Sequence, residues 1–115
     1  MNKYGQIAVR AAQYVNCNLS PREAWDKASC EIYPKGSASQ RKSCPRTTFL
    51  ALYDQTLQSP NALHARDARS YLAAHCACNT TPKALWESIL NGNHKTHNSQ
   101  MDVVLALYSY DLMPE

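Results

Sequence analysis

The segment CNLSPREAWD at residues 17–26 returns as CNTTPKALWE at residues 78–87, so the chain contains an internal repeat. Two further blocks recur in the same order: the Ser-Gln pair at 39–40 returns at 99–100, and FLALY at 49–53 returns as VLALY at 104–108. A repeat at this period indicates that each half is one supersecondary unit that cannot bury its apolar face alone. We therefore expect two related halves, near residues 1–58 and 62–113, that share one core within a single domain spanning residues 1–115.

The composition favours an all-α domain. Only 3 of the 115 residues are glycine, 44% are hydrophobic, and there are few β-branched runs. No apolar run approaches the roughly 18 residues that indicate a membrane span, so we expect no membrane partner. The first residues lack the basic and apolar segments of a signal peptide, which predicts a cytoplasmic protein whose five cysteines are reduced thiols.

Hydrophobic spacing predicts six helices, near residues 2–15, 21–33, 45–57, 63–77, 82–90 and 99–112. Ser20 and Thr81, each followed by proline, should cap the second and fifth helices, and Ser99 should cap the sixth. We expect Leu57 and Leu112 to belong to the apolar stripes of the third and sixth helices, and His75 or Cys76 to point inward from the fourth. The two helices that contain LALY are apolar on more than one face, so they should form the central pair.

The net charge of +3 is concentrated in two loops that occupy equivalent places in the two halves. Residues 35–46 contain four cations and no acid, and residues 91–100 contain Lys95 with His94 and His97. Without these five Lys and Arg residues, seven of the 12 basic residues remain against 9 acidic ones. The positive charge therefore belongs to the loops and not to the helices.

Three segments, SPREAW at 20–25, SASQRKSCPR at 37–46 and HNSQMDVVLAL at 97–107, resemble those of a family of small, uncharacterised bacterial proteins. The resemblance covers nearly the whole chain, and it extends to orphan proteins of the mobile gene-cassette type. The resemblance indicates candidate functional residues, and it implies no reaction.

The paired Ser-Gln loops are the candidate site. Helix N-termini present unpaired N–H groups and partial positive charge, which bind phosphate or carboxylate, and both loops add cations. We therefore predict a small non-catalytic binding or adaptor module, with no cofactor and no metal, whose partner is a small anion or a protein. The candidate ligand-binding residues are Ser39, Gln40, Lys42, Cys44, Arg46, His97, Asn98, Ser99 and Gln100. The alternative is structural: the serines cap helices and the glutamines tie down the loops.

Two other functions remain open. The basic loop at residues 35–46 could contact nucleic acid through phosphates, although no aromatic residue interleaves its cations. Cys44 lies beside cations and a predicted helix start, so it is a candidate nucleophile with His94 or His97 as base. His75, Cys76 and Cys78 suggest a metal site, but they lack the paired spacing of a structural zinc site. Trp25 and Trp86 fall on apolar stripes and should be core residues.

Overall fold

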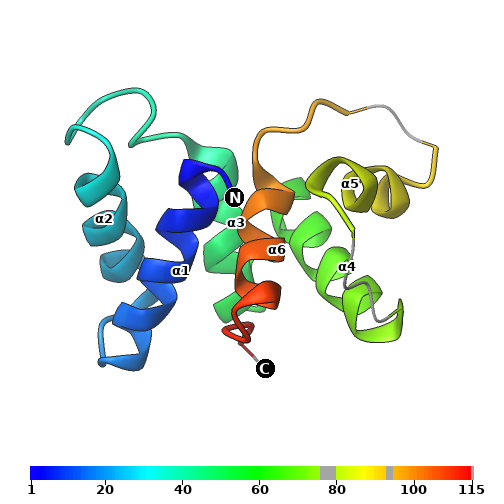
Figure 1. The fold of residues 1–115 in the computed structure, drawn as a ribbon, viewed down its shortest axis with the longest axis horizontal. Coiled ribbons are helices and arrows are strands. Elements are labelled where there is room, and N and C mark those ends of the chain that lie inside the picture. The colour runs from blue at the N-terminus through cyan, green and yellow to red at the C-terminus, as the bar shows by residue number, and fades with distance from the viewer. Residues whose placement is uncertain (76–79, 93–94, 115) are drawn as a thin grey trace.

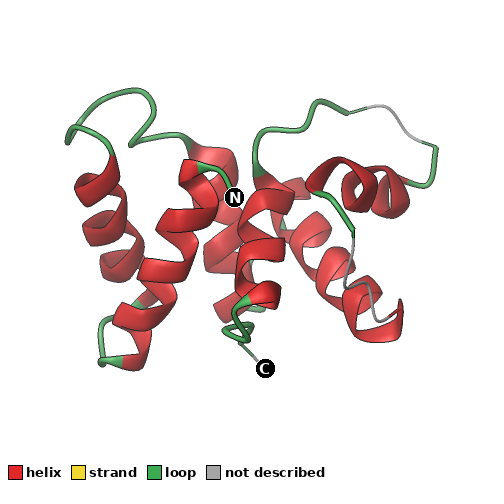
Figure 2. Cartoon of the chain, in the orientation of Figure 1, coloured by secondary structure: helices red, strands yellow, loops and turns green. Residues whose placement is uncertain are grey.

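The chain is all-α, as predicted (Figure 2). The structure is a computed structural model that describes residues 1–75, 80–92 and 95–114. Those ranges hold six helices and no strand, and none of the six is long and apolar enough to cross a membrane. The helices are α1 (Lys3–Asn16), α2 (Pro21–Ile32), α3 (Ser43–Tyr53), α4 (Pro60–His75), α5 (Pro82–Leu90) and α6 (Gln100–Ser109).

The helix that contains LALY in each half lies at the centre of the molecule. Helices α3 and α6 pack against each other, α1 covers α6, and α4 covers α3 (Figure 1). Helix α2 lies outside on α1 and α3, and α5 lies outside on α4 and α6. Each half therefore packs its first helix against the third helix of the other half, which is why neither half has a core of its own.

Burial explains the central position of α3 and α6. In α3 the five consecutive residues 48–52 are all buried, and in α6 Val103, Val104, Ala106 and Leu107 are buried. A helix that is apolar around most of its circumference must be covered on most sides. The covering helices α1 and α4 use small residues at their contact faces, chiefly alanines, which allows close approach.

Two of the three predicted helix starts are confirmed. The Ser20 hydroxyl accepts a hydrogen bond from the N–H of Glu23, and the Thr81 hydroxyl accepts one from Ala84. Each cap satisfies one of the four N–H groups that the first turn of a helix leaves without a backbone partner. Asn2 caps α1 in the same way.

Several predicted helix ends are wrong by a few residues. Helix α3 ends at Tyr53 and not near Leu57, because the Asp54 side chain accepts from the N–H and hydroxyl of Thr56 and turns the chain. Helix α6 ends at Ser109 because Asp111 adopts a left-handed φ of 55°. The N–H of Leu112 then bonds to the carbonyl of Leu107 at 2.8 Å, a Schellman turn with aspartate at the position that glycine usually occupies.

Helices α3 and α4 also begin earlier than predicted, at Ser43 and Pro60. The prediction that His75 points inward is wrong: this side chain is exposed and stacks on Tyr71 at a ring-centroid distance of 4.0 Å. The alternative inward residue, Cys76, lies outside the described ranges, as does Cys78. The helix order and packing are compatible with the sequence repeat, whereas the structural equivalence of the two halves stays a prediction.

The tryptophan of each half is buried, with exposed fractions of 1% for Trp25 and 5% for Trp86. Trp25 packs against Phe49 of α3 at a centroid distance of 5.1 Å. Trp86 instead contacts two histidines, His64 and His97. The two repeat partners therefore have different surroundings, although both belong to the core.

We expect Trp25→Ala to lower the free energy of unfolding by about 3–5 kcal/mol, the range for removing a large buried aromatic side chain. Urea denaturation followed by circular dichroism measures this change. Leu63→Ala is the matched control, because Leu63 is 46% exposed and its truncation should cost under about 0.5 kcal/mol. A loss for Trp25→Ala no larger than that of the control would contradict the core position of the indole.

Candidate functional site

Both Ser-Gln loops approach the start of α1. The Tyr4 hydroxyl donates to the backbone carbonyl of Ser39 at 2.9 Å, and the Asn2 amide donates to the Ser99 hydroxyl at 3.3 Å. Lys42 lies over the Tyr4 ring, with its ammonium 5.3 Å from the centroid. The two loops lie at the same end of the molecule with the N-terminus between them (Figure 1). The first residues of α1 thus bring together loops that are 60 positions apart in the sequence.

The two glutamines make the same kind of connection. The Gln40 amide nitrogen donates to the Ser29 hydroxyl of α2 at 2.9 Å, and its oxygen accepts from the N–H of Gly36. The Gln100 amide nitrogen donates to the side-chain oxygen of Asn61 in α4 at 3.1 Å, and its oxygen accepts from the N–H of Asn98. Each glutamine therefore ties its own loop to a neighbouring helix, as in the structural alternative.

The serines of these pairs do not cap helices. Ser39 lies before α3, whose N-cap position is occupied by Lys42 without a side-chain cap. Ser99 occupies the N-cap position of α6, but its φ of 66° is left-handed and its hydroxyl bonds to Asn2 instead. The expected cap comes from His97, whose Nε2 accepts the N–H of Met101 at 3.0 Å.

The remaining candidates of the first loop are dispersed. Arg46 pairs with Asp26 of α2, with 3.5 Å between Nε and Oδ1, so its charge is partly neutralised. Cys44 is a half-buried free thiol, and no hydrogen bond joins it to a histidine in the described ranges. His94, the other proposed base, lies outside those ranges. Lys42 is the cation of this loop whose charge contributes to lowering the pKa of His97, after burial of that ring.

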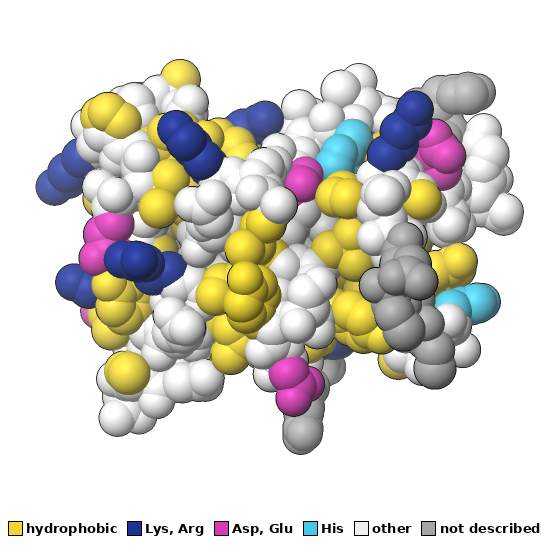
Figure 3. Space-filling model, viewed as in Figure 1, with side chains coloured by type: hydrophobic (Ala, Val, Ile, Leu, Met, Phe, Trp, Pro, Cys, Tyr) yellow, Lys and Arg dark blue, Asp and Glu magenta, His cyan; other side chains and the backbone are white. Residues whose placement is uncertain are grey.

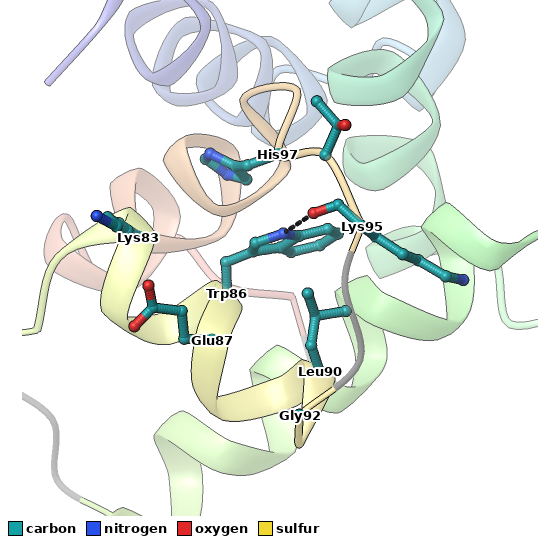
Figure 4. A pocket seen from close by; sticks show the side chains of 8 residues that line it. Lys83, Trp86, Glu87, Leu90, Gly92, Lys95 and His97 are labelled. Carbon is teal, nitrogen blue, oxygen red and sulfur yellow. Dashed lines mark hydrogen bonds between the residues drawn. The ribbon is translucent and has the colours of Figure 1, made fainter.

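A hollow with a volume of about 870 Å³ lies beside Trp86. Helix α5 and the chain that follows it form its walls, and Figure 4 shows the indole between them. The indole nitrogen donates to the backbone carbonyl of Lys95 at 3.0 Å, which holds the second Ser-Gln loop against α5. The lining residues are Lys83, Trp86, Glu87, Leu90, Gly92, Lys95, Thr96 and His97.

Trp86 contacts two histidines. The His64 ring of α4 meets it edge-on at a centroid distance of 5.0 Å, and the His97 ring lies at 5.3 Å. Burial is the main cause that lowers the pKa of both histidines below the usual value. Lys95 adds to this effect at His64, whereas Asp102 opposes it at His97. Both rings are therefore neutral near pH 7.

The charge around the hollow is mixed. Lys83 and Glu87 lie on one side of the indole, and the Lys95 side chain extends away on the other (Figure 4). Basic, acidic and histidine side chains gather over α5 and the following loop, with apolar surface between them (Figure 3). None of the ion pairs found in the described ranges involves Lys83 or Lys95. Such a hollow can hold a small molecule that has both an apolar part and an anionic group.

The metal candidates gain no support from the geometry of the described ranges, where no group of three or more His, Cys, Asp and Glu side chains could hold an ion. Cys76, Cys78 and His94, on which those interpretations partly depended, lie outside these ranges. The free thiols of the described chain are Cys17, Cys30 and Cys44.

The fold and the hollow define a small helical protein with a ligand-sized depression beside one buried tryptophan. Residues 1–114 match the profile of a family of unknown function, DUF6979, so the chain belongs to this family. No curated protein and no solved structure matches the chain. The resemblance to an uncharacterised family is thus confirmed, while bacterial origin and the gene-cassette type stay predictions.

The sequence interpretation missed part of this site. The apolar stripe predicts only a core position for Trp86, and no sequence pattern points to His64. Their proximity depends on how α4, α5 and the loop before α6 pack together, which the spacing of residues within one helix does not encode. One signal was present: in the aligned repeats, Phe49 of the first half corresponds to the smaller Val104 of the second.

We expect Gln100→Ala to lower the free energy of unfolding by about 1–3 kcal/mol, because it leaves the half-buried partners of the amide, at Asn61 and Asn98, unsatisfied. Gln100 is only 3% exposed, whereas Gln40 is half-buried, so Gln40→Ala should cost less. Urea denaturation of both variants tests the order. Gln13→Ala on the exposed face of α1 is the control, and a Gln100→Ala loss equal to that of the control would rule out the tie.

Proposed function

We propose that this protein is a small non-catalytic binding module that holds a small organic anion in the hollow beside Trp86. The observation that carries the proposal is the composition of that hollow: an indole and Leu90 supply apolar contact, and Lys83, Lys95 and His97 also belong to the lining. Ligand sites typically have volumes of roughly 300–1,000 Å³ and combine apolar walls with a few polar groups. The volume of about 870 Å³ falls in that range.

The polar groups favour negative charge over positive charge. Two lysines against one glutamate leave the lining with an excess of one positive charge when His97 is neutral. Because Nε2 of His97 accepts from Met101, the proton of the neutral ring must be on Nδ1, which has no hydrogen-bond partner in the described ranges. That N–H is a further donor for a carboxylate or phosphate oxygen.

The Ser-Gln loops have a supporting part in this proposal. Gln100 and the Trp86–Lys95 hydrogen bond fix the second loop against α4 and α5, which preorganises one wall of the hollow. The first loop contributes Lys42, whose positive charge adds to lowering the pKa of His97. The proposed site is therefore one hollow beside the second loop, with the first loop contributing to its electrostatic field.

The nucleic-acid and cysteine-enzyme alternatives have less support. Pairing of Arg46 with Asp26 and placement of Lys42 over Tyr4 leave Lys35 and Arg41 as the fully exposed cations of the first loop. Two exposed cations form a small electrostatic footprint for a nucleic acid. In the part of the chain that the structure describes, no hydrogen bond joins Cys44 to a histidine, the contact that would activate its thiol.

We expect benzoate, which combines a ring with a carboxylate, to raise the melting temperature at constant ionic strength. A ligand at ten times its dissociation constant stabilises the folded state by about 1.4 kcal/mol, which corresponds to a shift of several degrees for a domain of this size. Inorganic phosphate and benzyl alcohol separate the contributions of charge and ring, and each should act more weakly than benzoate. Differential scanning fluorimetry measures all three.

The variant that tests the site is Lys83→Ala, which should reduce the benzoate shift, and Lys35→Ala on the exposed first loop is its control. If salt weakens benzoate binding steeply and both variants reduce the shift equally, the binding is electrostatic and non-specific. If no probe stabilises the wild type, or if the shift is unchanged in Lys83→Ala, the hollow is not an anion site.

A further inference from the structure

The start of α6 is capped by a histidine ring. Nε2 of His97 lies 3.0 Å from the backbone nitrogen of Met101 and accepts its N–H. The residue at the N-cap position, Ser99, cannot provide this cap because its hydroxyl bonds to Asn2 and its backbone is left-handed. Met101 is itself fully buried, so its N–H depends on this one ring nitrogen for a partner.

This cap requires a neutral ring. A neutral imidazole has one nitrogen that accepts a hydrogen bond, whereas an imidazolium has two N–H donors and no acceptor. Protonation of Nε2 would therefore direct an N–H toward the N–H of Met101. It would also place a positive charge at the N-terminus of α6, where the helix dipole is positive as well.

A second partner for the protonated ring lies nearby. Oδ2 of Asp102 is 4.0 Å from the same Nε2, and the two side chains are only 24% and 17% exposed. A small rotation would let the imidazolium donate to this carboxylate in place of the bond with Met101. One ring nitrogen therefore has two alternative partners, an N–H donor when it is neutral and a carboxylate when it is charged.

The other charged groups near His97 come from every element packed around it. Lys42 approaches from the first loop, and Lys83 and Glu87 line the same hollow from α5. Lys95 belongs to the loop of His97 itself, and the His64 ring of α4 also contacts the indole. Burial lowers the pKa of His97, with Lys42 acting in the same direction and Asp102 against it.

A change at His97 would reach Trp86 directly. The two rings are in contact, and the Trp86 nitrogen is bonded to the loop only two residues before His97. We propose that His97 is a pH-dependent latch. The neutral ring caps α6 and holds the second Ser-Gln loop against Trp86. When acid protonates the ring, Nε2 exchanges its hydrogen bond with Met101 for one with Asp102, and the loop loosens. The latch belongs to the fold itself and does not depend on the proposed ligand.

The sign of the pH dependence follows from linkage. The pKa of His97 is lower in the folded state than its unfolded value of about 6.5, so the unfolded chain binds the proton more readily. Stability is therefore complete above about pH 6.5 and falls as the pH decreases from there toward the folded pKa. His64 contributes a fall of the same sign, so the overall pH dependence of stability does not by itself identify the latch.

The test is site-specific hydrogen exchange by NMR between pH 7.5 and 5.5. After correction for the intrinsic exchange rate, protection of the Met101 amide should fall at least about 10-fold relative to that of Leu107 in the same helix, since loss of a cap frays the first turn. In a Trp25→Phe background, Trp86 fluorescence should change with the same midpoint. This background removes no hydrogen bond found in the described residues, because the Trp25 nitrogen has no partner there.

Two variants identify the group that titrates. His97→Gln retains an acceptor that does not titrate, so both transitions should disappear, and Asp102→Asn should move the midpoint to lower pH by removing the partner of the charged ring. His64→Gln and the exposed His75→Gln should keep both transitions. If the transitions persist in His97→Gln, or if Met101 protection in the wild type is constant across this pH range, the latch is excluded. The wild-type measurement decides the matter even if a variant fails to fold.

Discussion

The burial of α3 and α6 is the constraint on which the other elements depend. Five consecutive buried residues in α3 leave that helix without a polar face for solvent, so it must be covered on most of its circumference. The four other helices provide the cover, with α1 and α4 in direct contact and α2 and α5 outside them. Because each central helix comes last in its half of the chain, the loop before it must return from the outer helix to the centre. Those two return loops are the Ser-Gln loops.

This return path explains why polar groups are buried where the loops meet the central helices. A loop that enters the core carries backbone N–H and carbonyl groups with it, and these need partners. Gln40 and Gln100 supply them from side chains, each accepting from its own loop and donating to a different helix. Thr48 in α3 is fully buried, and its hydroxyl donates to the carbonyl of Cys44 within the first turn. The buried polar atoms near the loops are therefore mainly structural.

Local patterns in the sequence were sufficient for the helices and insufficient for the site. Ser20 and Thr81 cap as predicted because a cap involves residues only three positions apart. Ser99 has the same local pattern with Asp102 but does not cap, because Asn2, 97 residues away, takes its hydroxyl. The Gln100–Asn61 bond and the contact of His64 with Trp86 also join distant parts of the chain. Sequence spacing predicted where the loops lie, and it could not predict which side chains meet there.

The two tryptophans, which are partners in the sequence repeat, have different surroundings. In the aligned repeats, Phe49 beside Trp25 corresponds to Val104, which has a smaller side chain. Phe49 packs on Trp25 at a centroid distance of 5.1 Å, and the Trp25 nitrogen has no hydrogen-bond partner among the described residues. Beside Trp86 two histidines occupy the neighbouring positions, and the indole nitrogen bonds to the loop. The two histidine rings place proton-binding groups against a core residue. His97 caps α6, and α6 is one of the two central helices on which the other helices pack. A change in the protonation of His97 therefore acts on a helix that supports the whole domain.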